Sequence, residues 1–232
     1  MAGKRFLKAK EQIEDRDYSV PEAIELLQKV KFAKFDETLE AHLRLGVDPK
    51  HADQMVRGTV VLPHGTGKSK KVLVVATGEK VHEAEQAGAD FAGGEEMVDK
   101  IAGGWMEFEA MIATPDMMKS VAKLGKVLGP RGLMPNPKSG TVTFDVARAV
   151  QEVKAGKVEF RVDKTSNVHV QLGKMSFSKD KLIDNTRTLV DAILKAKPPA
   201  AKGKYIQRFY LTATMCPSVR IDTAALETKS AS

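Results

Sequence analysis

The sequence predicts two structural units: a discontinuous α+β domain built from both chain ends, and an α/β domain inserted between its halves. Residues 1–67 and 157–232 contain strands in which apolar and polar residues alternate, typical of an antiparallel sheet with one buried face. Residues 68–156 contain short, uniformly apolar strands that alternate with helices, the pattern of a parallel sheet covered on both faces. Glycines close to both junctions, Gly65, Gly67 and Gly156, fit the hinges of an inserted domain.

The first part of the chain predicts two helices followed by two strands. Residues 4–15 form a polar, charged helix, and a second helix begins at a capping box in which Ser19 is followed three residues later by Glu22. A strand over residues 38–45 turns one set of side chains inward and the alternating set outward, and a further strand covers residues 58–62. The inward set is Leu39, Ala41, Leu43 and Leu45.

The middle of the chain predicts strands at residues 72–76, 90–92 and 110–113 and helices at 81–87, 95–102, 115–124 and 146–154. Residues 128–141 carry three glycines and three prolines, so they predict a shaped loop. Gly67-Lys68-Ser69 resembles the end of a phosphate-binding loop, but Leu62 stands where its first glycine would be. The segment also leads into a strand rather than a helix, which argues against a nucleoside-triphosphate site.

The last part predicts a hairpin, a helix and a strand. Residues 158–162 and 168–172 alternate around a turn at 163–167, a helix follows Ser178, and a strand over 205–215 ends before Pro217. Neither chain end has enough apolar faces to form a core alone. We therefore expect one α+β domain with an antiparallel sheet backed by helices, formed from residues 1–67 and 157–232.

Composition favours a globular protein with an anionic partner. The 232 residues are 42% apolar and 29% charged, and no run approaches the ~20 apolar residues of a membrane helix. The single cysteine, Cys216, excludes an internal disulfide and a thiolate-rich metal cluster. The net charge of +7 falls entirely in residues 157–232, which hold 14 Lys/Arg and 7 Asp/Glu. That asymmetry favours a nucleic acid or an anionic membrane surface as partner, or else a solvated basic face.

Catalytic patterns are weak in this sequence. The five histidines are scattered, no Ser–His–Asp or Cys–His spacing occurs, and no His-x-x-x-His metal pair is present. We therefore expect a binding protein without cofactor or metal. The candidate RNA-contacting segments are the polar face of residues 38–44, the turn at 163–167 and the strand end at 214–218. Glu40 is informative, because an acid on such a surface can accept from a ribose 2′-OH and so favour RNA over DNA.

Several ordered motifs together resemble the bacterial ribosomal protein L-one family. They are FDETLE at residues 35–40, DQMVRG at 53–58 with LPHGTG at 62–67, the loop 128–141, residues 160–174, and TATM at 212–215. The resemblance implies an rRNA-binding domain built from both termini, an inserted doubly wound, Rossmann-like domain, and no enzymatic activity. It further implies a cytoplasmic protein, monomeric when free, that binds large-subunit rRNA at the mobile stalk, contacts departing E-site tRNA and represses its own operon mRNA.

The resemblance also implies a set of RNA-contacting residues. The family's positions correspond here to one group on the first strand, one on the turn and its following strand, and one at the end of the last strand. Where the family usually has glycine, this chain has Ser166 and Cys216. The full predicted set is Lys34, Phe35, Thr38, Glu40, Asp163, Lys164, Thr165, His169, Thr214, Met215, Cys216 and Ser218.

Two other functions remain as alternatives at this point. A small-molecule or nucleotide-binding enzyme could use the inserted parallel sheet, although no Gly-x-Gly-x-x-Gly follows residues 72–76. A peripheral membrane protein is disfavoured, because the chain lacks a basic amphipathic helix with bulky aromatic residues.

Overall fold

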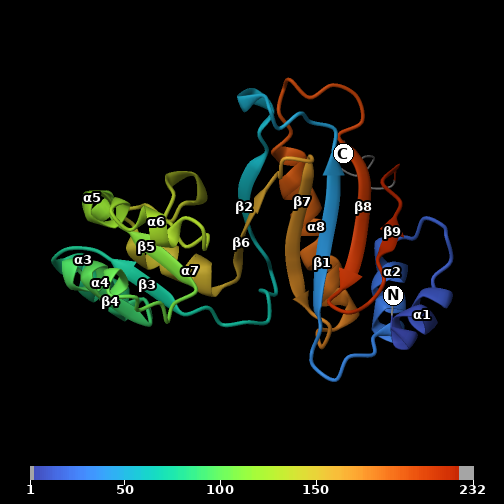
Figure 1. Cartoon of the computed structure of the whole chain (residues 1–232), viewed down its shortest axis with the longest axis horizontal. Helices are drawn as coiled ribbons and strands as arrows, with labels where there is room; N and C mark the ends of the chain where they lie inside the picture. Colours follow the sequence, from blue (N-terminus) through green and yellow to red (C-terminus); the bar gives the residue numbers. More distant parts are fainter. Residues whose placement is uncertain (1–2, 225–232) are drawn as a thin grey trace. The chain divides into compact units, whose positions relative to one another are not determined.

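A computed structural model describes residues 3–224 of the chain (Figure 1). Its contacts divide the chain into two compact units, one formed by residues 1–67 with 158–232 and the other by residues 68–157. The sequence predicted that the inserted domain ends at residue 156, one residue earlier than in the structure. Hydrophobic side chains from both chain ends share one buried core, and no side chain from the second unit belongs to it.

The first unit contains a four-stranded antiparallel sheet in the order β7-β1-β8-β9, which confirms the predicted antiparallel sheet. Helices α2 and α8 pack against one face of this sheet, as Figure 1 shows behind the strands. A separate two-stranded sheet pairs β2 with β6. The elements are α1 (Lys4–Glu11), α2 (Val20–Val30), β1 (Thr38–Leu45), a 3-10 turn (Ala52–Gln54), β2 (Arg57–Val61), β6 (Lys157–Arg161), β7 (Asn167–Lys174), α8 (Lys179–Lys195), β8 (Ile206–Ala213) and β9 (Val219–Ile221).

The predicted hairpin of residues 158–172 is wrong. Strand β7 forms its ladder with β1, whereas β6 pairs with β2, and the Val162 N–H continues that pairing by donating to the Val56 carbonyl at 2.9 Å. Between β6 and β7 the backbone bond from the Asp163 N–H to the Asn167 carbonyl, at 2.8 Å, closes a loop but does not continue as a ladder. Local alternation identifies strands, but their partners here come from the distant N-terminal segment, which the pattern does not encode.

Other predicted boundaries also shift. The first helix ends at Glu11 rather than residue 15, and β8 ends at Ala213, after which the Cys216 N–H turns back to the Ala213 carbonyl. Strand β9 was not predicted, because three residues are too few for a visible alternation. The expected helix over 115–124 is instead a 3-10 turn at Pro115–Met117 followed by a short α-helix at Met118–Ala122.

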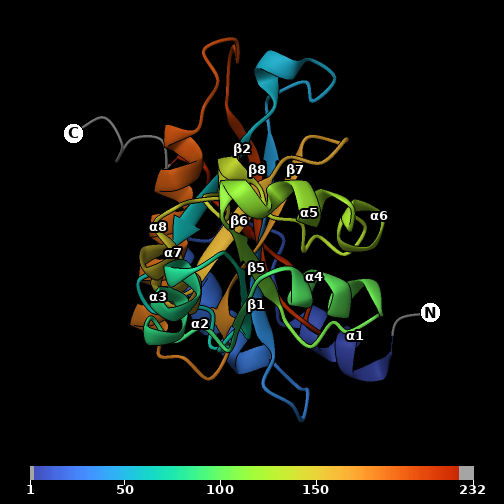
Figure 2. The same cartoon turned by 90° about the vertical axis from the view of Figure 1, so that its left-hand side faces the viewer.

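The second unit contains a three-stranded parallel sheet in the order β4-β3-β5, which confirms the predicted parallel sheet. One apolar cluster joins this sheet to α4, α5 and α6, and another joins it to α3 and α7; Figure 2 shows the two groups of helices on either side of the strands. The elements are β3 (Val72–Val75), α3 (Glu79–Gln86), β4 (Phe91–Gly93), α4 (Glu95–Ala102), β5 (Ala110–Ala113), a 3-10 turn (Pro115–Met117), α5 (Met118–Ala122), α6 (Gly125–Leu128), a 3-10 turn (Pro137–Ser139) and α7 (Val146–Lys154).

Candidate RNA interface

The antiparallel sheet of the first unit has one apolar and one polar face. Leu39, Ala41 and Leu43 of β1 are buried with α2 and α8, so the alternating side chains of β1 lie on the other face. The strand registers place polar residues of β7 and β8 directly opposite them. The polar face therefore carries Thr38, Glu40, His42 and Arg44 from β1, Asn167, His169, Gln171 and Lys174 from β7, and Arg208, Tyr210 and Thr212 from β8.

At one end of this face, a threonine of β1 is bonded to a threonine that follows β8. The Thr38 N–H donates to Thr214 Oγ1 at 2.9 Å, and Thr214 Oγ1 donates to the Thr38 carbonyl at 3.4 Å. Lys174 Nζ from β7 donates to Thr38 Oγ1 at 2.9 Å. We call Thr38, Thr212, Thr214 and Lys174 the threonine end. The predicted residues Thr38 and Thr214, which lie far apart in the sequence, are in direct contact here.

Two apolar side chains stand out into solvent beside the threonine end. Phe35 is 56% exposed and Met215 is 49% exposed. Phe35 precedes Thr38 by three residues, and Met215 directly follows Thr214. Large exposed apolar side chains in such a setting are suited to stack on an unpaired base.

Cys216, in contrast, lies below the surface. It is 7% exposed, and its Sγ donates to Glu37 Oε2 at 3.4 Å. Burial, followed by the negative charge of Glu37, raises the pKa of the Cys216 thiol to about 12. The residue is therefore a neutral structural thiol and offers no side-chain contact to a ligand on the polar face.

The predicted turn residues lie at the opposite end of β1. Asn167 pairs with Arg44, six residues along β1 from Thr38, so at ~3.4 Å for each residue the loop before Asn167 lies at least about 20 Å from Thr38. The backbone of Lys204 closely approaches Gly46 at this same end. We call Arg44, Lys164, Lys204 and Arg208 the basic end. The predicted residues thus lie at both ends of the polar face, with Glu40 and His169 between the ends.

The turn itself is held by Asp163. Its Oδ1 accepts from the N–H groups of Thr165 and Asn167, both at 2.8 Å. Burial alone would raise the pKa of Asp163, but these hydrogen bonds lower it below its ordinary value. Ser166 adopts φ 66°, a left-handed conformation that favours glycine, and its hydroxyl donates to the Val47 carbonyl at 2.9 Å. The chain thus accepts a serine at this position by bonding its side chain inward.

A histidine pair bridges the two ends. His42 Nδ1 and His169 Nδ1 are 2.7 Å apart, so one ring must donate its proton to a neutral partner. Their outer nitrogens each lie 3.7 Å from a carboxylate, His42 from Glu40 and His169 from Asp163. Burial, and then His169, lower the pKa of His42. The predicted residues Glu40, His169 and Asp163 therefore form one continuous line across the face.

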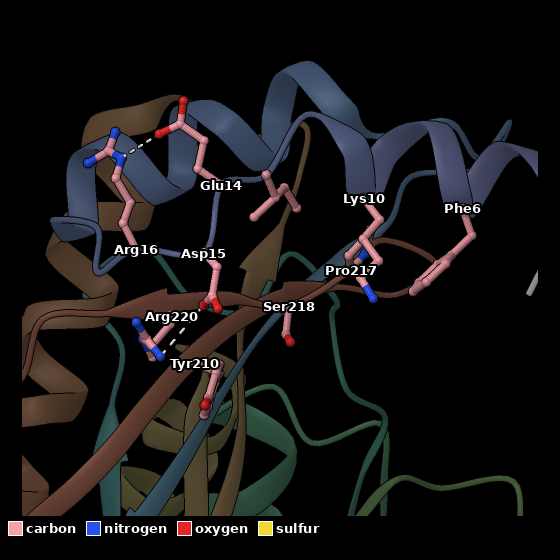
Figure 3. A pocket seen from close by; sticks show the side chains of 10 residues that line it. Phe6, Lys10, Glu14, Asp15, Arg16, Tyr210, Pro217, Ser218 and Arg220 are labelled. Atoms are coloured by element: carbon pink, nitrogen blue, oxygen red, sulfur yellow. Dashed lines mark hydrogen bonds and ion pairs between the residues drawn. The ribbon is translucent and has the colours of Figure 1, made fainter.

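Ser218 lies apart from the threonine end, in a recess of about 450 Å³. Figure 3 shows it on the strand side of this recess near Tyr210, with Lys10 and Phe6 on the helical side. Arg220 also lines the recess and forms an ion pair with Asp15 at 3.7 Å. Lys34 is exposed in the segment before β1.

The comparisons with known proteins agree with the sequence motifs. The model of the ribosomal protein L1p/L10e family matches residues 27–217. A curated relative, the large ribosomal subunit protein uL1 of Solibacter usitatus (strain Ellin6076), is 63% identical over 230 residues, which are 99% of this chain and 97% of the relative. The chain belongs to the ribosomal protein L1p/L10e family. The predicted resemblance is confirmed.

Membership of the ribosomal protein L1p/L10e family makes the chain a structural protein and not an enzyme. Within residues 3–224, no cluster of three or more His, Cys, Asp or Glu side chains could hold a metal ion. No helix in that range is both long and apolar enough to cross a membrane. The alternative of an enzyme that uses the parallel sheet is not supported.

Several residues of the interface were missed by sequence reasoning. Lys174, Gln171 and Tyr210 belong to the face only because their strands pair with β1 in one register. Glu37 was missed because an acid that follows two exposed residues, Phe35 and Asp36, gives no sign of burial. The alternation of β1 itself was sufficient to find His42 and Arg44 on the polar face, although not to single them out.

Proposed function

We propose that this chain is a structural component of the large ribosomal subunit and that it binds the rRNA of the mobile stalk through the polar face of the antiparallel sheet. The observation that carries the proposal is the threonine end, where the bond between Thr38 and Thr214 joins two of the family's sequence motifs on one surface. The relative named a large ribosomal subunit protein covers nearly the whole chain and supports the same assignment.

The two ends of the face would contribute differently to binding. The basic end attracts the phosphate backbone whatever the RNA sequence, and its contribution weakens as salt rises. The threonine end carries hydroxyls that suit sugars, and the exposed apolar side chains of Phe35 and Met215 beside it suit unpaired bases. Recognition of one RNA fold therefore depends mainly on the threonine end.

Glu40 gives the face its preference for RNA. It lies between Gln171 of β7 and Thr212 of β8, and its carboxylate is partly exposed. A carboxylate repels phosphate unless it accepts a hydrogen bond from a ribose 2′-OH or a base amine. We expect Glu40 to accept such a bond, which DNA could not supply from its sugar.

Two further activities follow from the family resemblance and belong to this proposal. The protein assists movement and release of E-site tRNA while it is held on the stalk. It also represses translation of its own operon by binding a similar RNA fold in the messenger leader. The single polar face described above would serve both RNAs, so stalk rRNA and messenger leader should compete.

Equilibrium binding to a transcribed stalk fragment of large-subunit rRNA tests the proposal. We expect the fragment to bind more tightly than an RNA hairpin of equal length, and more tightly than the same sequence made as DNA. Addition of the messenger leader should displace the rRNA fragment. Equal affinity for all these nucleic acids would contradict the proposal.

A further inference from the structure

Glu37 is a charged side chain enclosed within the first unit. It is 1% exposed, and within residues 3–224 it forms no ion pair with a lysine or arginine. An isolated buried carboxylate is costly unless hydrogen bonds replace its hydration. The hydrogen bonds that it accepts therefore indicate what this residue does.

The carboxylate joins two segments that are almost 180 residues apart. Its Oε1 accepts from the Ala33 N–H at 3.0 Å, before β1. Its Oε2 accepts from the Met215 N–H at 3.2 Å and from Cys216 Sγ at 3.4 Å, after β8. The Glu37 carbonyl also accepts from the Met175 N–H at 2.8 Å, which brings in the end of β7.

These contacts lie where the sheet no longer holds the chain. Strand β1 begins at Thr38 and β8 ends at Ala213, so Phe35 and Met215 lie outside the ladder. Both side chains are exposed and are among the residues proposed to meet RNA. Without a link between the two segments, binding would have to order both of them, and that ordering weakens affinity.

We propose that Glu37 is a positioning residue of the RNA interface: its buried carboxylate fixes the segments that carry Phe35 and Met215, and thereby preorganises the threonine end. This inference rests on the proposed function. The role requires two acceptor oxygens, one for each segment. Glutamine has the same shape but only one acceptor, because its NH₂ group would face an N–H donor on one side.

The test compares Glu37→Gln with Asn185→Ala. Asn185 is a matched control, because it is also buried and polar and joins the His64 N–H, at 3.1 Å, to the Leu172 carbonyl, at 2.8 Å. We expect Glu37→Gln to weaken binding of the stalk rRNA fragment by about tenfold or more, since ordering costs then fall on binding. The folded fraction of Asn185→Ala should bind the fragment with an affinity within about twofold of that of the unchanged protein. Loss of hydrogen bonds at Asn185 lowers stability but leaves the interface residues in place.

A second measurement reports on the contacts of the Glu37 carboxylate without RNA. Cys216 is the single thiol of the chain, and the charge and hydrogen bond of Glu37 help to raise its pKa to about 12. Titration of the thiolate absorbance should give a lower pKa in Glu37→Gln and no change in Asn185→Ala. An unchanged thiol pKa in Glu37→Gln would overturn the proposal.

The outcomes separate this inference from the proposed function. If the unchanged protein does not bind the fragment, the proposed function fails, whatever the thiol shows. If it binds and Glu37→Gln binds equally well despite an altered thiol, the positioning role fails. If Glu37→Gln does not fold, hydrogen exchange of the backbone N–H groups in the unchanged protein tests the proposal instead. Slow exchange at Ala33 and Met215 supports the hydrogen bonds to Glu37. Exchange as fast as in an unfolded chain overturns the proposal.

Discussion

Thr214→Val is the substitution that separates RNA recognition from protein stability most cleanly. Valine keeps the shape of threonine but removes the hydroxyl that bonds both the N–H and the carbonyl of Thr38. Thr214 is exposed, so water can satisfy the freed backbone groups in the unbound protein. In a complex with RNA, those groups would have to be satisfied at a surface from which water is displaced.

The expected magnitudes follow from this difference. Two hydrogen bonds contribute about 0.5–1.5 kcal/mol each, so loss of both from a dehydrated interface costs ~1–3 kcal/mol of binding free energy. At ~1.4 kcal/mol for each tenfold change, the affinity should fall by about 5- to 150-fold. The free energy of unfolding should fall by less than ~1 kcal/mol, because the site is hydrated in the free protein.

The assay is equilibrium binding to the stalk rRNA fragment, with urea unfolding measured in parallel. Thr188→Val is the matched control: Thr188 lies on α8, and its hydroxyl donates to the Asp184 carbonyl at 2.8 Å. We expect this control to bind RNA normally. The reasoning is refuted if Thr214→Val binds within twofold of the unchanged protein, or if Thr188→Val loses as much affinity.

Three further predictions concern charge, pH and the division of the chain. Lys164→Ala should weaken binding mainly at low salt and reduce the slope of log K against log salt by about one phosphate contact. Lys181→Ala on α8 is the control and should keep the slope of the unchanged protein. An unchanged slope in Lys164→Ala would contradict this prediction. The pKa of Cys216 is raised to about 12, so the folded state keeps a proton that the unfolded chain loses near pH ~8.5. The free energy of unfolding should therefore fall as pH rises toward 12, and it should fall less steeply in Cys216→Ala. If the urea midpoints of the two proteins change equally between pH 8 and 11, the thiol is not coupled to folding. Replacement of residues 68–157 by a Gly-Ser linker should leave affinity for the stalk fragment within about threefold, since the polar face and its core belong to the other unit; loss of binding by this shortened chain, if it folds as judged by circular dichroism, would place part of the interface in the second unit.

The sequence was most informative where structure is local. The alternation of β1 predicted its buried and polar faces, because side-chain direction follows from strand geometry alone. The capping box at Ser19 predicted the start of α2, where both reciprocal hydrogen bonds are present. The parallel sheet of the middle segment was predicted from its uniformly apolar strands.

Strand pairing was where the sequence was least informative. The supposed partners in the hairpin, β6 and β7, pair instead with β2 and β1, because a ladder depends on residues more than a hundred positions away. The same limit applied to the site. Without the register, His42 could not be placed against His169, nor Asp163 at the opposite end from Thr38.

Burial was the second limit. Glu37 lies in the motif FDETLE directly after the exposed residues Phe35 and Asp36, and nothing in that pattern indicates an enclosed carboxylate. Cys216 was grouped with the RNA-contacting residues by position in the motif. Its burial and its hydrogen bond to Glu37 instead give it a structural role.

Lysine acetylation of the free and RNA-bound protein tests the central claim most directly. Exposed lysines stand in the segment before β1, at Lys34, in the turn before β7, at Lys164, and on the helix that covers the apolar face, at Lys181 and Lys195. If the polar face binds the stalk rRNA fragment, Lys34 and Lys164 should be protected at least about fivefold, while Lys181 and Lys195 remain as reactive as in the free protein. Protection of Lys181 and Lys195, with Lys34 and Lys164 unchanged, would place the RNA on the helical side and contradict the account.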